Sequence, residues 1–247
     1  MAQPSTLSGF YERTRKARKI IVVDLGFLGD AVHLIPACWE LKRHYPQAEL
    51  HTLSAPVGAE ALALAPCVER AWAVELDPAR RTLGEQWRLV RALWRERFDL
   101  AVNFSGADRT VIMTALSGAR WRVAQAAGRR HFWNRWLIPF WVPRPAIDQP
   151  VFEQRRQVLA ACGFELAPPR FALQVPEAAR QRAEQLAPPG AIHLSINASS
   201  PLKEWPLPHW IELARRLLAQ PLGPVMTLLF GSVYTWGLLA WLVAALI

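Results

Sequence analysis

Residues 19–33 read KIIVVDLGFLGDAVH, and they give the clearest indication of the fold class. Ile20 to Val23 are apolar and β-branched, which predicts a strand buried on both faces of a parallel sheet. Gly26 and Gly29 then predict a turn that leads into a helix beginning at Asp30. Because open α/β folds bind ligands at the carboxyl ends of their strands, Asp30 is our first candidate for a functional residue.

Two interpretations of Asp30 remain open from this stretch, catalysis and helix N-capping. A dinucleotide site is not expected, because the turn lacks the G-x-G-x-x-G spacing and no acid ends the next predicted strand, His51 to Ala55. His33 follows Asp30 by three residues, on about the same helix face. It is a secondary candidate for ligand contact, and the alternative is an ordinary packed histidine.

Composition indicates a globular protein. The chain has 247 residues and is 52% hydrophobic, enough for one large α/β domain or two modest ones. The three cysteines, Cys38, Cys67 and Cys162, lie far apart, which excludes an ordinary zinc pattern and favours a reducing cytoplasm. The basic segment 1–18 is followed by no cleavable signal sequence.

The net charge of +9 is concentrated between Arg120 and Arg144, where six arginines occur with no acid. Tryptophan and phenylalanine are interleaved with them. This mixture suits stacked nucleic-acid bases, a lipid headgroup layer, or core aromatics with solvated arginines. No helix-turn-helix, KH or RRM pattern accompanies the charge, so nucleic acid is not an expected partner.

Strand-like and helix-like segments alternate along the chain, which predicts parallel strands joined by crossover helices. The predicted strands are 20–23, 50–53, 71–76, 100–104, 121–124 and 191–196. The predicted helices are 30–45, 57–65, 82–97, 108–117, 151–162, 176–186 and 208–219.

A second candidate loop, NASSPLKEWP, follows the last predicted strand at residues 197–206. Its Asn and Ser side chains offer hydrogen bonds, and Lys203 supplies a positive charge, which suits a phosphate-bearing ligand. The alternative is a turn that caps the next helix. The residues of this loop that we take as candidates are Asn197, Ser199, Ser200 and Lys203.

Together, the Gly-Asp-Ala-Val-His segment at residues 29–33 and the loop at 197–206 make the chain resemble glycosyltransferase family 9, the ADP-heptose:lipopolysaccharide heptosyltransferases, from about Lys19 to Gln220. The resemblance implies the α/β GT-B architecture, in which two Rossmann-like domains face each other across a cleft. We therefore expect a basic tail at 1–18, an acceptor-side domain at 19–187, the start of a donor-binding domain at 188–220, and an apolar tail at 221–247.

By this resemblance, Asp30 is the general base that activates an acceptor hydroxyl, and one displacement inverts the anomeric centre. Lys203 contacts the donor, ADP-heptose, and no metal or other cofactor is required. The acceptor is the lipopolysaccharide inner core, so we expect a cytoplasmic protein at the inner face of the cytoplasmic membrane. The remaining expected substrate-binding residues are Gly29, His33, Asn197, Ser199, Ser200, Arg120 and Arg122.

The resemblance ends at the tail, since Pro221 to Ile247 contain no charge and no Asp-Thr-Gly-like donor segment. Val225 to Ile247 could span a bilayer as a helix, which makes a membrane anchor one interpretation. The other is a truncation or frameshift, in which case we expect an inactive chain with little affinity for ADP-sugar. An alternative function is that of a non-catalytic, membrane-associated anion-binding protein in which Asp30 only caps a helix.

Overall fold

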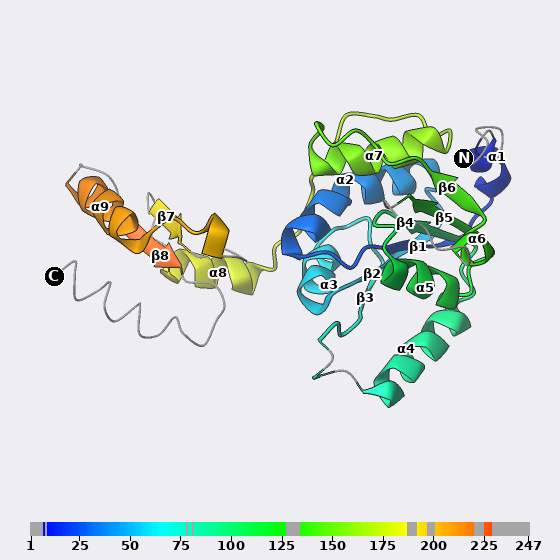
Figure 1. Ribbon diagram of the computed structural model, residues 1–247, viewed down its shortest axis with the longest axis horizontal. Coiled ribbons are helices and arrows are strands. Elements are labelled where there is room, and N and C mark those ends of the chain that lie inside the picture. The colour runs from blue at the N-terminus through cyan, green and yellow to red at the C-terminus, as the bar shows by residue number, and fades with distance from the viewer. Residues whose placement is uncertain are drawn as a thin grey trace. The chain divides into compact units, whose positions relative to one another are not determined.

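The computed structural model describes residues 7, 9–77, 79–80, 82–126, 134–186, 192–196, 201–219 and 225–228 (Figure 1). By its internal contacts the chain divides into two units, Met1–Gln174 and Val175–Ile247. The division lies before residue 187, where the sequence places the end of the first domain. Each unit is described by itself.

The first unit is built on a six-stranded sheet in the order β3-β2-β1-β4-β5-β6, with every pair parallel. The predicted parallel sheet is confirmed. The chain fills one half of the sheet with β1, β2 and β3, from the centre to one edge, and then the other half with β4, β5 and β6, from the centre to the other edge. β1 and β4 are therefore neighbours although two strands separate them in sequence. The strands are β1 Lys19–Val23, β2 Glu49–Ser54, β3 Arg70–Ala73, β4 Leu100–Asn103, β5 Trp121–Gln125 and β6 Phe140–Val142.

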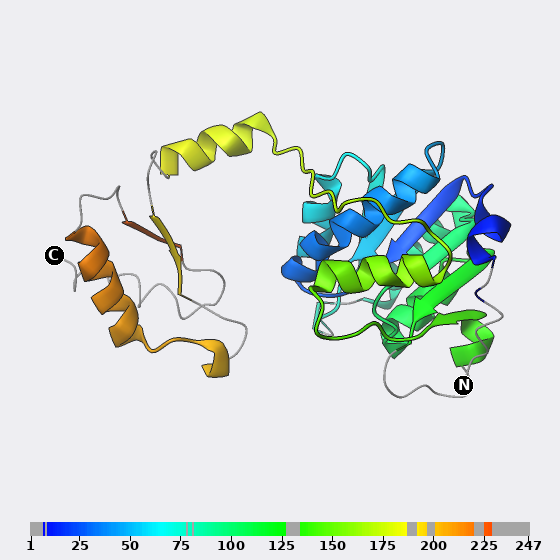
Figure 2. The same cartoon turned by 90° about the horizontal axis from the view of Figure 1, so that it is seen from above.

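Helices cover both faces of this sheet, which is why β1 is apolar at successive positions. Ile20 and Val22 belong to the core under α2 and α7, and Ile21 and Val23 to the core under α4 and α5. Figure 1 shows these two layers, and Figure 2 shows α2 and α7 side by side. The helices are α1 Phe10–Thr14, α2 Leu28–His44, α3 Pro56–Ala63, α4 Leu83–Glu96, α5 Asp108–Leu116, α6 Asn134–Leu137 and α7 Val151–Ala161.

The segment at 1–18 is more than a basic tail, because α1 is part of the first unit and packs against β6 and the end of α2. The Phe10 ring lies 4.9 Å from that of Phe140, and Thr14 Oγ1 lies 2.7 Å from the Tyr45 hydroxyl. Phe10 and Thr14 are both buried. One short helical turn among basic residues has no hydrophobic periodicity that a sequence analysis can detect.

In the second unit, two strands that are joined through a helix pair in parallel. Its elements are α8 Glu177–Leu186, β7 Ile192–Ser195, a 3₁₀ turn Pro201–Lys203, α9 Leu207–Leu218 and β8 Val225–Leu228. β7 and β8 pair in parallel, and α9 packs Ala214 against Leu194 and Ile196.

β8 lies in the apolar tail that the sequence offered as a membrane helix, so its four residues are a strand and not the first turn of that helix. A short apolar strand and a membrane helix can have the same composition, which is why the pattern did not distinguish them. Residues 221–224 and 229–247 lie outside the described residues. Within the described part, none of the helices has the length and apolar character needed to cross a bilayer.

Candidate functional site

A cavity of about 370 Å³ opens at the carboxyl ends of β1 and β4. At this point the strand order reverses, and the segments that leave the two strands diverge to opposite faces of the sheet. Open parallel sheets bind their ligands in such a crevice. The cavity is lined by Asp24, Leu25, Gly26, Asp30, Leu76, Phe104, Ser105, Ala107, Arg109, Thr110 and Arg155.

Asp30 lies in the first turn of α2 and lines this cavity. Its Oδ2 accepts a hydrogen bond from the Phe27 backbone N–H at 3.0 Å, and its side chain is 37% exposed. A carboxylate in this position also complements the positive end of the helix. Asp30 therefore stabilises the start of α2 and at the same time presents an oxygen to the cavity, so the two interpretations of this residue do not exclude each other.

Arg155, on α7, fixes the Asp30 carboxylate from the other side. Its Nη2 lies 3.5 Å from Asp30 Oδ1, and its Nε donates to Asp24 Oδ2 at 3.0 Å. The side chains of Arg155 and Asp24 are only 8% and 6% exposed. One buried guanidinium thus bridges two carboxylates, and Asp30 is the one of the two that is open to solvent.

Asp24 directly follows β1, and its Oδ1 accepts from the Gly26 backbone N–H at 3.0 Å. Burial raises the pKa of Asp24 above its ordinary value, while Arg155 and the Gly26 N–H act in the opposite direction. Sequence reasoning missed this pair. An acid at the end of a buried strand does signal a buried partner, but that partner lies 131 positions away.

One nitrogen of the Arg155 guanidinium is unsatisfied in the described part of the chain. Nη1 is buried and has no hydrogen-bond partner among the described residues. Buried polar groups are almost always hydrogen-bonded in folded proteins. This unsatisfied donor lies on the same guanidinium that holds Asp24 and Asp30.

Gly26 leaves room for Asp30. A Cβ at position 26 would lie 2.5 Å from both Cβ and Oδ2 of Asp30. We expect Gly26→Ala to displace the carboxylate and to lower any activity that depends on it by about 10²-fold, the scale of an ångström-sized misplacement. Turnover and chemical denaturation, measured on the same preparations, check this.

The matched control is Gly84→Ala in α4, because a Cβ there meets nothing within 4 Å. We expect it to keep full activity and to gain about 0.5–1 kcal/mol of stability from the helical alanine. Equal activity of the Gly26 and Gly84 variants would contradict the steric argument.

Gly29 and His33, also predicted from the first motif, lie on α2 but are not among the residues that line the cavity. Gly29 is exposed. His33 is half-buried and stacks on Phe152, with the ring centroids 6.2 Å apart. The structure therefore brings Asp30, and neither of its two motif neighbours, to the wall of the cavity.

The second motif is described only in part. Lys203 ends the 3₁₀ turn Pro201–Lys203 of the second unit, and its side chain is exposed. Asn197, Ser199 and Ser200 lie outside the described residues.

Arg120 and Arg122 lie away from the cavity. Arg120 immediately precedes β5, so it is at the amino edge of the parallel sheet, whereas Asp30 is at the carboxyl edge. Its guanidinium lies 5.7 Å from the centre of the Trp121 ring. Arg122 donates to the carbonyls of Leu137 and Ala119, each at 2.7 Å. The charge pattern identified these arginines, but their location depends on the position and direction of β5 in the sheet.

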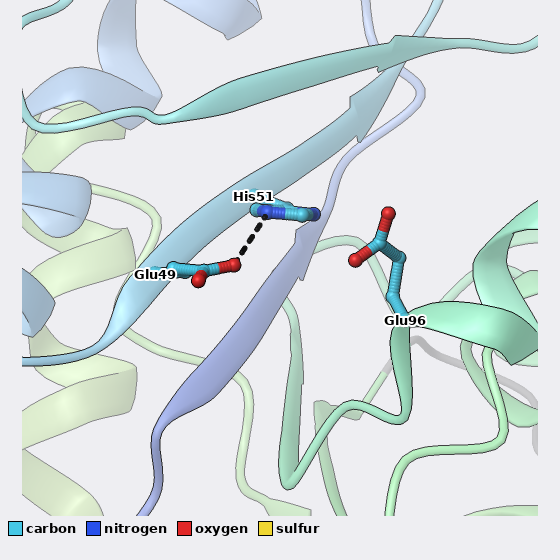
Figure 3. A group of neighbouring side chains, drawn as sticks. All are labelled: Glu49, His51 and Glu96. Atoms are coloured by element: carbon cyan, nitrogen blue, oxygen red, sulfur yellow. Dashed lines mark ion pairs between the residues drawn. The ribbon is translucent and has the colours of Figure 1, made fainter.

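Glu49, His51 and Glu96 form a group with the ligand types of a metal site (Figure 3). Lys19 Nζ, however, pairs with both carboxylates, 3.1 Å from Glu49 and 2.8 Å from Glu96. Trp72 Nε1 donates to His51 Nδ1 at 3.1 Å.

This hydrogen bond argues against a metal at His51. Tryptophan can only donate, so the neutral ring carries its proton on Nε2, the nitrogen nearer to Glu49. A metal-binding histidine has the reverse arrangement, with one nitrogen bare and the other donating to an acceptor. Burial also lowers the pKa of His51, which keeps the ring neutral. The group is an ion-pair cluster around Lys19.

Comparison with known proteins gives one family match. The model of glycosyltransferase family 9 (heptosyltransferase) matches residues 86–232. The matched range includes Lys203 and runs past Gln220, but it begins after Asp30. No curated protein sequence is similar enough to this chain to count as a relative.

Solved structures of the same family share the fold. A family 9 glycosyltransferase from Veillonella parvula superimposes with a TM-score of 0.75 at 16% identity, over 92% of this chain and 66% of its own. The E. coli ADP-heptose lipopolysaccharide heptosyltransferase II gives 0.69 at 21% identity, over 93% and 69%. E. coli heptosyltransferase WaaC, solved with ADP-2-deoxy-2-fluoro heptose, gives 0.68 at 17%, over 91% and 72%. The chain thus spans about two thirds of the length of these proteins.

Proposed function

The chain belongs to glycosyltransferase family 9, and from this premise we propose that it transfers a heptosyl group from ADP-heptose to a hydroxyl of the lipopolysaccharide inner core. The observation that carries the proposal is the Asp30 carboxylate, held at the cavity by the Phe27 N–H on one side and Arg155 on the other. ADP and a fluorinated ADP-heptose are bound by structural neighbours with this fold.

In the proposed reaction, Asp30 takes the proton of the acceptor hydroxyl as that oxygen attacks the anomeric carbon. The bond from this carbon to the diphosphate breaks, and ADP leaves with the electron pair. One base is sufficient because the diphosphate is a good leaving group. Attack from the face opposite the leaving group inverts the anomeric centre.

Lys203 would balance the charge that develops on the departing diphosphate, with Asn197, Ser199 and Ser200 as hydrogen-bonding partners of the donor. We propose that no metal takes part. Arg120 and Arg122 would face the anionic acceptor or the lipid leaflet that carries it, at the inner face of the cytoplasmic membrane. These assignments rest on the motif at 197–206 and on the charge of the arginine-rich segment.

The test is a transfer assay with ADP-heptose and a heptose-free core acceptor. We expect ADP release that depends on the acceptor, a product heavier by one heptose, an inverted anomeric configuration by NMR, and no loss of rate with a chelator. Retention of configuration would overturn the mechanism. Saturable acceptor binding without turnover would favour the non-catalytic alternative, and the absence of both would overturn the proposal.

A further inference from the structure

The α4 helix exposes three large apolar side chains that the catalytic proposal does not use. Leu83, Trp87 and Trp94 are 84%, 72% and 63% exposed. Leu83 lies one turn before Trp87, and Trp94 lies two turns after it, so the three share one face of the helix. We call these residues the α4 stripe. The opposite side of α4 packs Leu93 and Leu89 in the core beneath the sheet, so the helix has two apolar faces and only one of them is covered.

Arginines run beside the α4 stripe. Arg88, Arg91 and Arg95 are spaced by three and four residues and are all exposed. Within the described part of the chain, none of the three forms an ion pair with a carboxylate. The exposed face of α4 therefore combines an apolar strip with adjacent cations.

Neither acid of α4 forms an ion pair with these arginines, although Glu85 lies close enough to Arg88 for the two charges to interact. Glu85 accepts from the Thr82 hydroxyl at 2.6 Å, at the start of the helix. Glu96 pairs with Lys19 and Arg70 at the edge of the sheet. With three exposed arginines and one exposed acid, Glu85, α4 still presents a net positive charge outward.

The neighbouring helix α5 also exposes two large apolar side chains, Ile112 and Leu116. The two helices contact each other. At the end of this contact, the Trp94 ring packs against Gly118, just after α5. A Cβ placed at Gly118 would lie 3.3 Å from the ring. The α4 stripe is therefore fixed to the body of the first unit.

We propose that this face of α4 is the docking surface for an anionic lipid bilayer. Tryptophan suits the boundary between headgroups and acyl chains, because its ring is apolar and its N–H is polar. Arginines at the edge of such a strip reach lipid phosphates. A second copy of the chain fits less well, because a symmetric interface would bring the two rows of arginines together. The inference extends the proposed function and rests on it for its biological role.

The experiment is co-sedimentation of the full chain with vesicles of phosphatidylcholine alone and of phosphatidylcholine with phosphatidylglycerol, without any sugar substrate. We expect binding to the anionic vesicles only. Arg88→Glu/Arg91→Glu should weaken this binding by about 10- to 30-fold, because each arginine near the surface adds one positive charge that the anionic lipids attract. Trp87→Ser/Trp94→Ser should weaken it by about tenfold.

Matched controls come from exposed residues elsewhere. Arg180→Glu/Arg182→Glu reverses two charges on α8, and Ile147→Ser removes another exposed apolar side chain. Both should sediment like the unmodified protein, and Trp136→Ser tests the arginine-rich segment in the same assay. Equal sedimentation of the α4 variants and their controls would overturn the proposal. A dimer that dissociates in the tryptophan variant would also overturn it and would assign the face to a second copy.

Transfer to a water-soluble acceptor separates this inference from the catalytic one. The α4 variants should transfer to such an acceptor at the unmodified rate, because α4 contributes no residue to the cavity. A chain that sediments with anionic vesicles but transfers no sugar would overturn the proposed function and leave α4 as the docking surface.

Discussion

Asp30→Asn lowers the rate of heptosyl transfer by about 10²- to 10⁴-fold, the usual contribution of a positioned general base. The amide is nearly isosteric with the carboxylate, and its oxygen can still accept from the Phe27 N–H. The start of α2 should therefore keep its structure, while the group that takes the acceptor proton is gone. We expect kcat to fall with little change in acceptor affinity, measured by steady-state kinetics and equilibrium titration.

Asp148→Asn is the matched control, because Asp148 is exposed in the loop between β6 and α7 and does not line the cavity. It should transfer at the unmodified rate. If Asp30→Asn kept its kcat within a few-fold while circular dichroism showed a folded protein, Asp30 would be a helix-capping residue only. The base would then have to be sought among the other residues that line the cavity.

The sheet was predictable from the sequence because its two central strands, β1 and β4, are covered by helices on both faces and carry runs of apolar residues. Two departures are instructive. α2 begins at Leu28, before Asp30, because Asp30 bonds back to the Phe27 N–H from within the first turn. β6 was missed because its three residues, Phe140–Val142, stand between two prolines and resemble a loop.

The site was predictable only where it is local in sequence. Asp30 could be placed because the strand, the glycine turn and the helix that position it are contiguous. Its partner could not, because Arg155 and Arg156 are adjacent on α7 and carry the same charge. Arg155 reaches Asp24 and Asp30, whereas Arg156 reaches Glu40. Which arginine faces the cavity depends on how α7 packs against α2, and no local pattern encodes that.

Replacing Arg155 by methionine should have the largest combined effect on stability and activity. The change leaves Asp24 buried without its cation, and breaking a buried ion pair in this way costs about 3–5 kcal/mol. It also removes the group that holds Asp30 from the α7 side. We expect a loss of that size in the free energy of unfolding by denaturant titration, together with at least about 10²-fold lower transfer by the folded fraction.

Arg156→Met is the internal control, since Arg156 is equally buried but pairs with Glu40 and Glu153, away from the cavity. It should lose stability on the same scale and keep its kcat at a temperature where it is folded. If both variants lost transfer in proportion to their stability, Arg155 would act through the fold alone.

The double variant Asp24→Leu/Arg155→Met separates the two roles of the arginine. Replacing both members of a buried ion pair by apolar groups is often neutral or stabilising, so most of the lost stability should return. Transfer should stay low, because Asp30 is then held only by the Phe27 N–H. A double variant that regains stability and transfer together would show that Arg155 serves only to neutralise Asp24. A variant that regains stability alone would establish Arg155 as a positioning residue for the base.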